Sequence, residues 1–461
     1  MLNQSTAERV LARALASGGD FSEIYLEDTD ATTLTMASGK LETANSGRSF
    51  GAGVRVFQGN RSVYVYTNDC TEAGLLSAAE QAAAAIGAVG TGPDVRLAWH
   101  DTPQAHPIAI VPATVAASRK ADRVREAYAA AAGFDPVVSQ VEVIYRDWAR
   151  RKWIANSEGL FTGDSQTYTQ INATAVASEG GETQTGARRP GRQMGFELFD
   201  TVVDCAEVGR YAANIAVTML RAQPCPAGRM PVVIDNGFGG VIFHEACGHS
   251  LEATSVAKGS SVFCGKLGEV IANPVVTALD DGTIPNAWGS GNIDDEGMPT
   301  QRLTLIENGV LKSYLVDKLG GRRMNAAPTG CGRRQSYRFA PTSRMSNTFI
   351  APGPHSNEEI IASVADGLYC KTMGGGSVNP ATGEFNFAVL EGYLIRNGKI
   401  DRPVRGATLI GKGSEVLLRI DRVGKALDFG QGMCGSASGS IPADVGQPMV
   451  RVSEMIVGGR K

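Results

Sequence analysis

The first 222 residues combine two kinds of hydrophobic pattern. Apolar residues recur at helical spacing in four segments, 5–18, 71–89, 114–132 and 202–221. Apolar and polar residues alternate, as in half-buried strands, at 24–26, 32–36, 51–57, 61–66, 141–148, 152–155 and 168–177. Because helices and strands come in blocks rather than as βαβ units, residues 1–222 are expected to form an α+β domain with an antiparallel sheet.

Beyond a proline-containing break at 223–228, the pattern becomes strand-rich. Hairpin turns are predicted at Asp280–Gly282, Glu307–Gly309 and Asn397–Gly398, each flanked by apolar runs. Ser356 and Glu359 form a capping-box pattern that opens one helix. Residues 229–461 are therefore expected to form a second, β-rich domain.

Composition excludes several classes of protein. The chain has 461 residues, of which 43% are hydrophobic and 20% charged, and its net charge is −3. The near-neutral charge and the absence of a basic run argue against a nucleic-acid binder, and no apolar run is long enough to cross a membrane. We expect no N-terminal secretion signal. The eight cysteines are scattered singly without a C-x-x-C pair. We therefore expect reduced thiols and a cytoplasmic location.

The segment His244-Glu245-Ala246-Cys247-Gly248-His249 carries the strongest chemical signal. It follows a short β-branched strand, 230–235, and a glycine-rich turn, 237–240, at the start of a helix-like stretch, 241–251. Two histidines on either side of a glutamate are typical of a zinc protease helix. The alternative is a pair of core histidines bonded to backbone carbonyls. The metal site is favoured because the whole chain has only five histidines, and two of them fall in this motif around a glutamate.

Three histidines lie outside this motif. His100 and His106 fall in a proline-rich connector, 90–112, and are expected to be surface residues. The third is His355.

The spacing of the two motif histidines differs from that of the common zinc helix. There the histidines are four residues apart, whereas here they are five apart. At about 100° per residue, a regular α-helix would separate His244 and His249 by about 140°. A π-bulge would bring them back into line, and Gly248 would let the backbone deform. We therefore predict a distorted helix with a π-bulge.

A catalytic zinc site needs a third protein ligand as well as an open position for water. Spacing leaves three candidates, Cys434, Cys247 and Glu252. Cys247 lies near the face of His244, but three donors on one turn would crowd one another. Cys434 lies in a distant glycine-rich segment, 430–436, that is expected to be an exposed turn. A ligand from such a distant loop closes a tetrahedron more easily.

Several motifs together resemble one known family. They are HEACGHSLE, SVFCGKLGEVIA, Ile293–Gly297, Pro328–Gly330 with Gly332–Tyr337, Gly374–Gly376 before an expected strand, and Gly432–Gly435. In this order they are similar to the TldD branch of the TldD/PmbA (TldE) metalloprotease family. The resemblance covers most of the second half of the chain.

The resemblance implies specific roles. His244, His249 and Cys434 would bind Zn²⁺, and Glu245 would be the general base. It also implies an α+β N-terminal domain, and a β-rich C-terminal domain that carries the metal-binding helix. The protein would be a homodimer, or a heterodimer with a PmbA/TldE-like subunit, enclosing a channel for unfolded or extended peptides. Cys247 stands where the family pattern has a small apolar residue.

The sequence therefore predicts a zinc metallopeptidase with an H-E-x-x-x-H site. Two other functions are considered. One is a zinc hydrolase of small non-peptide amides. The other is a non-catalytic regulatory or binding subunit, which the intact motif and Cys434 disfavour.

Overall fold

The computed structural model describes residues 2–88, 90–379 and 382–459. The N-terminal half contains α1 (Gln4–Ala14), β1 (Phe21–Ala37), β2 (Lys40–Gln58), β3 (Arg61–Thr67), α2 (Glu72–Ala84), β4 (Ala98–His100), η1 (Pro112–Thr114), α3 (Ala117–Ala132), β5 (Val138–Asn156), β6 (Leu160–Glu179), β7 (Glu182–Arg188), β8 (Gly191–Arg192), α4 (Leu198–Thr201) and α5 (Cys205–Arg221).

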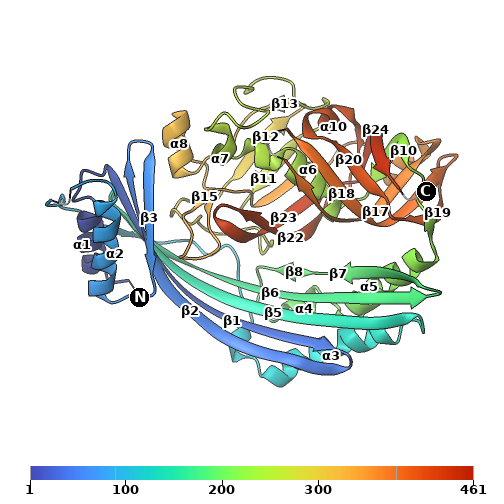
Figure 1. Ribbon diagram of the computed structural model, residues 1–461, viewed down its shortest axis with the longest axis horizontal. Helices are drawn as coiled ribbons and strands as arrows, with labels where there is room; N and C mark the ends of the chain where they lie inside the picture. The colour runs from blue at the N-terminus through green and yellow to red at the C-terminus, as the bar shows by residue number, and fades with distance from the viewer. Residues whose placement is uncertain (1, 89, 380–381, 460–461) are drawn as a thin grey trace.

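These elements form one long, curved sheet with helices on one face (Figure 1). The strand order is β3-β2-β1-β5-β6-β4, with β7 and β8 also paired to β6. One core joins α1 and α2 to β1 and β2, and a second joins α3 and α5 to β5 and β6. On the opposite face, Tyr25 and Ile154 pack against Ile293 and Tyr337 of the C-terminal half.

The C-terminal half contains β9 (Gln223–Pro224), β10 (Gly228–Ile234), η2 (Phe238–Gly240), α6 (Val241–Ala246), η3 (Gly248–Leu251), α7 (Ala253–Val256), β11 (Ala278–Asp281), β12 (Arg302–Glu307), β13 (Val310–Leu311), α8 (Lys318–Met324), β14 (Gly332–Arg333), β15 (Thr342–Ser343), β16 (Asn347–Ile350), α9 (Asn357–Ala362), β17 (Asp366–Val378), β18 (Glu384–Arg396), β19 (Lys399–Arg405), β20 (Thr408–Lys412), α10 (Gly413–Arg419), β21 (Ile420–Val423), β22 (Asp428–Ser436), β23 (Gly439–Gln447) and β24 (Val450–Gly458).

Two sheets dominate this half. In one, the order β17-β10-β24-β20-β18 closes on itself, because β17 also pairs with β18. The other has the order β13-β12-β11-β16-β23-β22, which places β22 at an edge. Together with the antiparallel N-terminal sheet, they make the protein α+β, as the sequence predicts.

Buried ion pairs join the two halves. Arg55 on β2 donates to Glu23 of β1 and to Glu296 of the C-terminal half, both at 2.7 Å. Lys152 on β5 donates to Asp295 at 2.8 Å. All five side chains are buried. Removing one partner would leave a buried charge uncompensated, which makes these pairs a strict constraint on how the halves fit together.

The structure confirms several local predictions. Ser356 and Glu359 form the expected capping box. Asn308–Gly309 and Asn397–Gly398 have positive φ at both residues and join β12 to β13 and β18 to β19. This is the geometry of a type I′ hairpin turn.

Other local predictions are wrong. The first helix begins earlier than the expected residue 5, at Gln4, and its cap is Asn3, whose side chain accepts from Ser5. The two expected strands 24–26 and 32–36 are one strand, β1, and 141–148 and 152–155 are likewise one strand, β5. Polar residues interrupt the apolar pattern in both. They nevertheless pair with neighbouring strands along their length, as in Asp28↔Arg151.

Two glycine-containing motifs also differ from expectation. Asp280–Gly282 is not a hairpin turn, because Asp280 and Asp281 lie in β11, which pairs with β12 and β16. The Asp280 carboxylate is buried and accepts from Ser346 and Thr348. Gly374–Gly376 lies inside a strand, β17, rather than in a loop, and the strand expected after it is β18. Gly376 pairs with Phe387, and a Cβ on Gly376 would lie 2.1 Å from the Asn386 carbonyl oxygen.

Candidate metal centre

The two motif histidines lie on two short helices that meet at a break. His244 is on α6, which ends at Ala246. Cys247 leaves helical geometry with φ −129° and ψ −49°, and His249 lies on the 3₁₀ helix η3. The predicted π-bulge is therefore wrong. A break followed by the tighter 3₁₀ turn accommodates the five-residue spacing instead.

Close packing leaves no room for a side chain at Gly248, the residue after the break. A Cβ at Gly248 would lie 2.2 Å from Sδ of Met345, which is fully buried. The absence of a side chain lets η3 pack directly against Met345. The position thus requires glycine for close approach, and its φ is not in the left-handed region.

We expect Gly248→Ala to destabilise the fold by about 1–3 kcal/mol, the usual cost of overpacking a core. The displaced η3 should also weaken metal binding through His249. Thermal unfolding with and without Zn²⁺ measures both effects. The control is Gly435→Ala, beside Cys434, where an added Cβ meets no atom within 4 Å. Equal stability of the two variants would contradict the packing argument.

Cys434 reaches the site from the edge strand β22. This residue pairs with Ile441 of β23, and its side chain is 7% exposed. The segment 430–436 is a strand rather than the exposed turn predicted from its glycines. Its neighbour Met433 is 54% exposed. Strand alternation turns Cys434 inward and Met433 outward.

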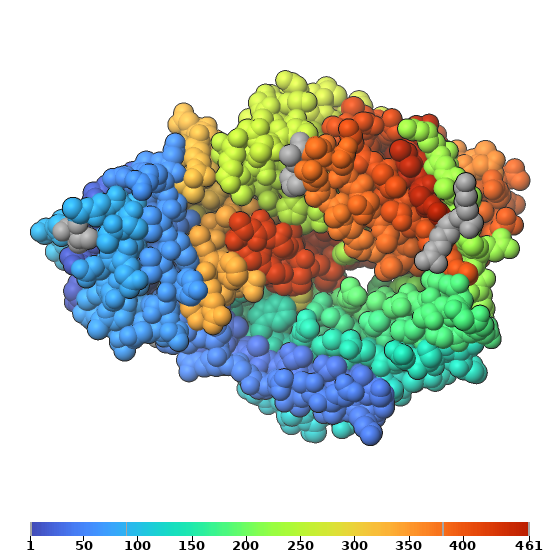
Figure 2. All heavy atoms as spheres, viewed as in Figure 1, coloured from blue at the N-terminus to red at the C-terminus, as the bar shows by residue number. Residues whose placement is uncertain are grey.

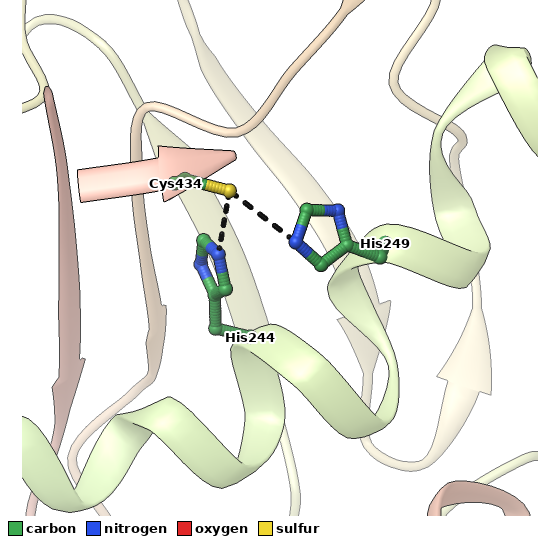
Figure 3. A group of neighbouring side chains, drawn as sticks. All are labelled: His244, His249 and Cys434. Carbon is green, nitrogen blue, oxygen red and sulfur yellow. Dashed lines mark hydrogen bonds between the residues drawn. The ribbon is translucent and has the colours of Figure 1, made fainter. Parts of the chain in front are cut away.

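The three side chains converge on one point (Figure 3). Sγ of Cys434 lies 3.2 Å from Nε2 of His244 and 3.3 Å from Nε2 of His249. One donor atom from each residue lies within 4.8 Å of the others. The structure thus brings together the three residues that the sequence resemblance implies as ligands.

The side chains of this group shift one another's pKa values. Burial opposes the thiolate, but His244 and His249 outweigh it, so the pKa of Cys434 lies well below its usual value. Burial also opposes the imidazolium, but Glu252 and Cys434 hold the pKa of His249 well above its usual value. Both shifts favour the thiolate form of Cys434, which is the form that binds a metal.

Glu252 orients His249 from the other side of its ring. Oε2 of Glu252 lies 3.2 Å from Nδ1 of His249, and the Glu252 side chain is 4% exposed. A carboxylate on Nδ1 fixes the tautomer and leaves Nε2 free to bind a metal. Of the three sequence candidates for the third donor, Glu252 therefore takes an outer position in this structure.

Cys247 faces away from the donor group. It is fully buried in the hydrophobic core of the C-terminal half. Burial raises the pKa of its thiol, so it remains protonated. It is not part of the clustered His244, His249 and Cys434 group.

Glu245 lies beside the donors. Its Oε2 is 3.8 Å from Nε2 of His249, and its side chain is 23% exposed. Solvent can therefore reach a carboxylate that borders the site.

The histidines of the connector lie away from the site. His100 is exposed, as predicted. His106 is buried, contrary to prediction, because its Nδ1 accepts from the backbone N–H of Asn286.

The donor set fits zinc. Zinc accepts both imidazole and thiolate ligands, and its catalytic sites keep three protein ligands with the fourth position left to water. Usual Zn–N and Zn–S bond lengths in a tetrahedron give N···S separations of about 3.5 Å. The observed 3.2 and 3.3 Å need to widen by only a few tenths of an ångström. The soft thiolate also disfavours Mg²⁺ and Ca²⁺.

The sequence matches family models along most of its length. Models of PmbA/TldA metallopeptidase domain 1, central domain and C-terminal domain match residues 22–86, 110–220 and 227–459. A protein named metalloprotease TldD homolog from Haemophilus influenzae is 35% identical over 449 residues, covering 95% of this chain and 93% of the relative.

Two further relatives extend the comparison. One named zinc metalloprotease TldD homolog, from Saccharolobus solfataricus, is 28% identical over 327 residues, covering 70% of this chain and 72% of the relative. The crystal structure of TldE from Thermococcus kodakarensis superposes with a TM-score of 0.75 at 18% identity, covering 96% and 97% of the two chains. That similarity concerns the fold alone. The family models and the identity to the TldD homologue show that this chain belongs to the PmbA/TldD family of metallopeptidases.

Proposed function

We propose that this metalloprotease is a zinc-dependent peptidase that cleaves unfolded or extended peptides. The observation that carries the proposal is the convergence of His244, His249 and Cys434 beside Glu245. The name of the Saccharolobus relative supports zinc as the metal.

Each residue has a role in this proposal. His244 and His249 would hold Zn²⁺ through Nε2 and Cys434 through Sγ, while Glu252 holds the ring of His249. A bound Zn²⁺ would lower the pKa of water and polarise a peptide carbonyl. Glu245 would take the proton from water and return it to the leaving amine nitrogen. The side chain of Glu245 is partly exposed, so water and the leaving amine nitrogen can both reach its carboxylate.

The strand that carries Cys434 suits an extended substrate. Among the described residues, β22 pairs along its length with β23 and is the last strand in its sheet, although Phe429 also bridges Gly237 and the carbonyl oxygens of Gly432 and Cys434 accept from Trp288 and Arg344. An extended peptide can add to such an edge through backbone hydrogen bonds, which gives weak side-chain selectivity. Figure 2 shows an opening between the C-terminal strands and the green layer that contains β7 and α5.

We further propose that residues 1–222 and 229–461 act as two domains, and that the chain works as a dimer. The partner would be a second copy or a PmbA/TldE-like subunit, and the fold it shares with TldE supports the latter. The eight cysteines, all within the described ranges, are free, which supports a reducing, cytoplasmic compartment. No described helix is long and apolar enough to span a bilayer.

Substrate form provides a direct test. We expect the chain, alone or with its partner subunit, to cleave a destabilised, mostly unfolded variant of a small protein at least about 100-fold faster than its native form. A stable domain is unfolded only roughly 10⁻³ to 10⁻⁶ of the time, so few molecules could enter the site. Mass spectrometry of the products over time gives both rates.

The control is the same pair of substrates with a non-specific protease that cleaves both forms. Equal rates from this chain would contradict an enclosed site and favour an open cleft. Zinc-dependent hydrolysis of small amides without cleavage of either polypeptide would favour the alternative amidase function.

A further inference from the structure

A buried arginine links the strand of Cys434 to the rest of the site. Arg344 lies between β15 and β16, and none of its surface is exposed. Its guanidinium donates to the carbonyl oxygen of Cys434 at 2.5 Å. It also donates to Ser438 Oγ and the Gly439 carbonyl oxygen at 2.9 Å each, in the turn between β22 and β23. These three bonds fix the end of the hairpin that supplies the thiolate.

The same side chain faces the histidine side of the site. Nε of Arg344 lies 3.8 Å from Oε1 of Glu252. The other oxygen of Glu252 lies 3.2 Å from Nδ1 of His249. Within the described part of the chain, neither Nε of Arg344 nor Oε1 of Glu252 has a hydrogen-bond partner. These two atoms therefore face each other as an ion pair, which joins the segment that carries Arg344 to the segment that carries Glu252.

This arrangement forms a continuous chain of contacts, from His249 through Glu252 and Arg344 to the backbone of Cys434. A buried guanidinium is costly to desolvate unless it is paired and bonded. Arg344 meets this requirement through contacts to both sides of the metal site. Arginine suits the position, since its planar fork directs several N–H groups at fixed angles, which lysine cannot do.

We propose that Arg344 is a positioning residue, which sets the separation between His249 and Cys434 and thereby the affinity and geometry of the metal site. The inference rests on the proposed metal-binding function and deepens it. Arg344 is fully buried and contacts the donors through backbone and carboxylate groups. It acts on the donors rather than on substrate.

The test uses Co²⁺ as a spectroscopic probe in the purified full chain. We expect Arg344→Lys to weaken Co²⁺ binding about 10- to 100-fold, the usual effect of losing an outer partner. The thiolate-to-cobalt absorption band should also shift or lose intensity, because lysine keeps the charge but cannot hold the hairpin and Glu252 together. Chelator competition gives the affinity. Thermal unfolding of the metal-free variant shows whether it folds.

Arg333→Lys is the matched control. Arg333 donates to the carbonyl oxygens of Met345 and Pro442, at 2.6 and 2.8 Å, and contacts none of the three donors. Its variant should bind Co²⁺ within about threefold of wild type with an unchanged band.

A second variant, Glu252→Gln, keeps the proposal testable if Arg344→Lys does not fold. Glu252→Gln keeps the shape of the side chain but removes its charge, and it should weaken binding to a similar extent. Wild-type affinity and spectrum in either Arg344→Lys or Glu252→Gln would overturn the positioning role. Failure of the metal site itself has a different signature, because the wild-type chain would then show no thiolate-to-cobalt band, and this inference would fall with it.

Discussion

Glu245→Gln should retain the metal and the fold but lose peptide hydrolysis by about 10²- to 10⁴-fold, the usual contribution of a general base. The reason is its location. Glu245 borders the donor group without belonging to it, 3.8 Å from Nε2 of His249, and it remains partly exposed. The amide has the same shape but cannot accept a proton from water. Steady-state cleavage of an unstructured fluorogenic peptide, with metal content measured on the same sample, gives both quantities.

A surface glutamate provides the comparison. Glu307→Gln changes an exposed residue at the end of β12, paired with Lys312. It should leave both activity and metal content unchanged. If Glu245→Gln turned over peptide at a near-normal rate with full metal content, Glu245 would have no part in the proton transfers.

Cys434→Ala should remove most of the bound zinc, whereas Cys247→Ala should retain it. Cys434 is the thiol within 3.3 Å of both histidine Nε2 atoms, and Cys247 faces the hydrophobic core. Loss of a direct ligand should exceed the roughly 10- to 100-fold cost of losing an outer partner. Metal analysis after dialysis provides the first measurement.

Thermal unfolding provides the second. A metal that binds only the native state raises the unfolding temperature. Added Zn²⁺ should therefore stabilise the wild type and Cys247→Ala but not Cys434→Ala. Cys247→Ala also serves as the control for a lost thiol, since it leaves a small cavity in a packed core. The reverse result would assign the third ligand to Cys247.

The sequence predicts several local features of this protein. A histidine pair around a glutamate, asparagine-glycine turns and a capping box each depend on residues close together in the chain. Asn308 and Asn397 adopt the positive φ that their turns require. The α+β class follows from the block order of helices and strands in the same way.

Features that depend on distant partners could not be predicted from the sequence. The need for glycine at position 248 depends on Met345, which packs where a side chain would be. Arg344 carries no motif of its own, and its role depends on Glu252 and Cys434, which are 92 and 90 residues away in the sequence. The burial of His106 likewise depends on Asn286. The burial of a polar residue cannot be predicted from the sequence pattern when its hydrogen-bond partner lies on a distant element.

The metal site is assembled from segments made at different times. Cys434 follows His249 by 185 residues. At a synthesis rate of about 5–20 residues per second, this separates the two by roughly 10 to 40 s on the ribosome. During that interval both histidines have been synthesised, but the thiolate that completes the donor group has not. A growing chain of this enzyme would thus lack its proposed third ligand while its own unfolded segments are most exposed.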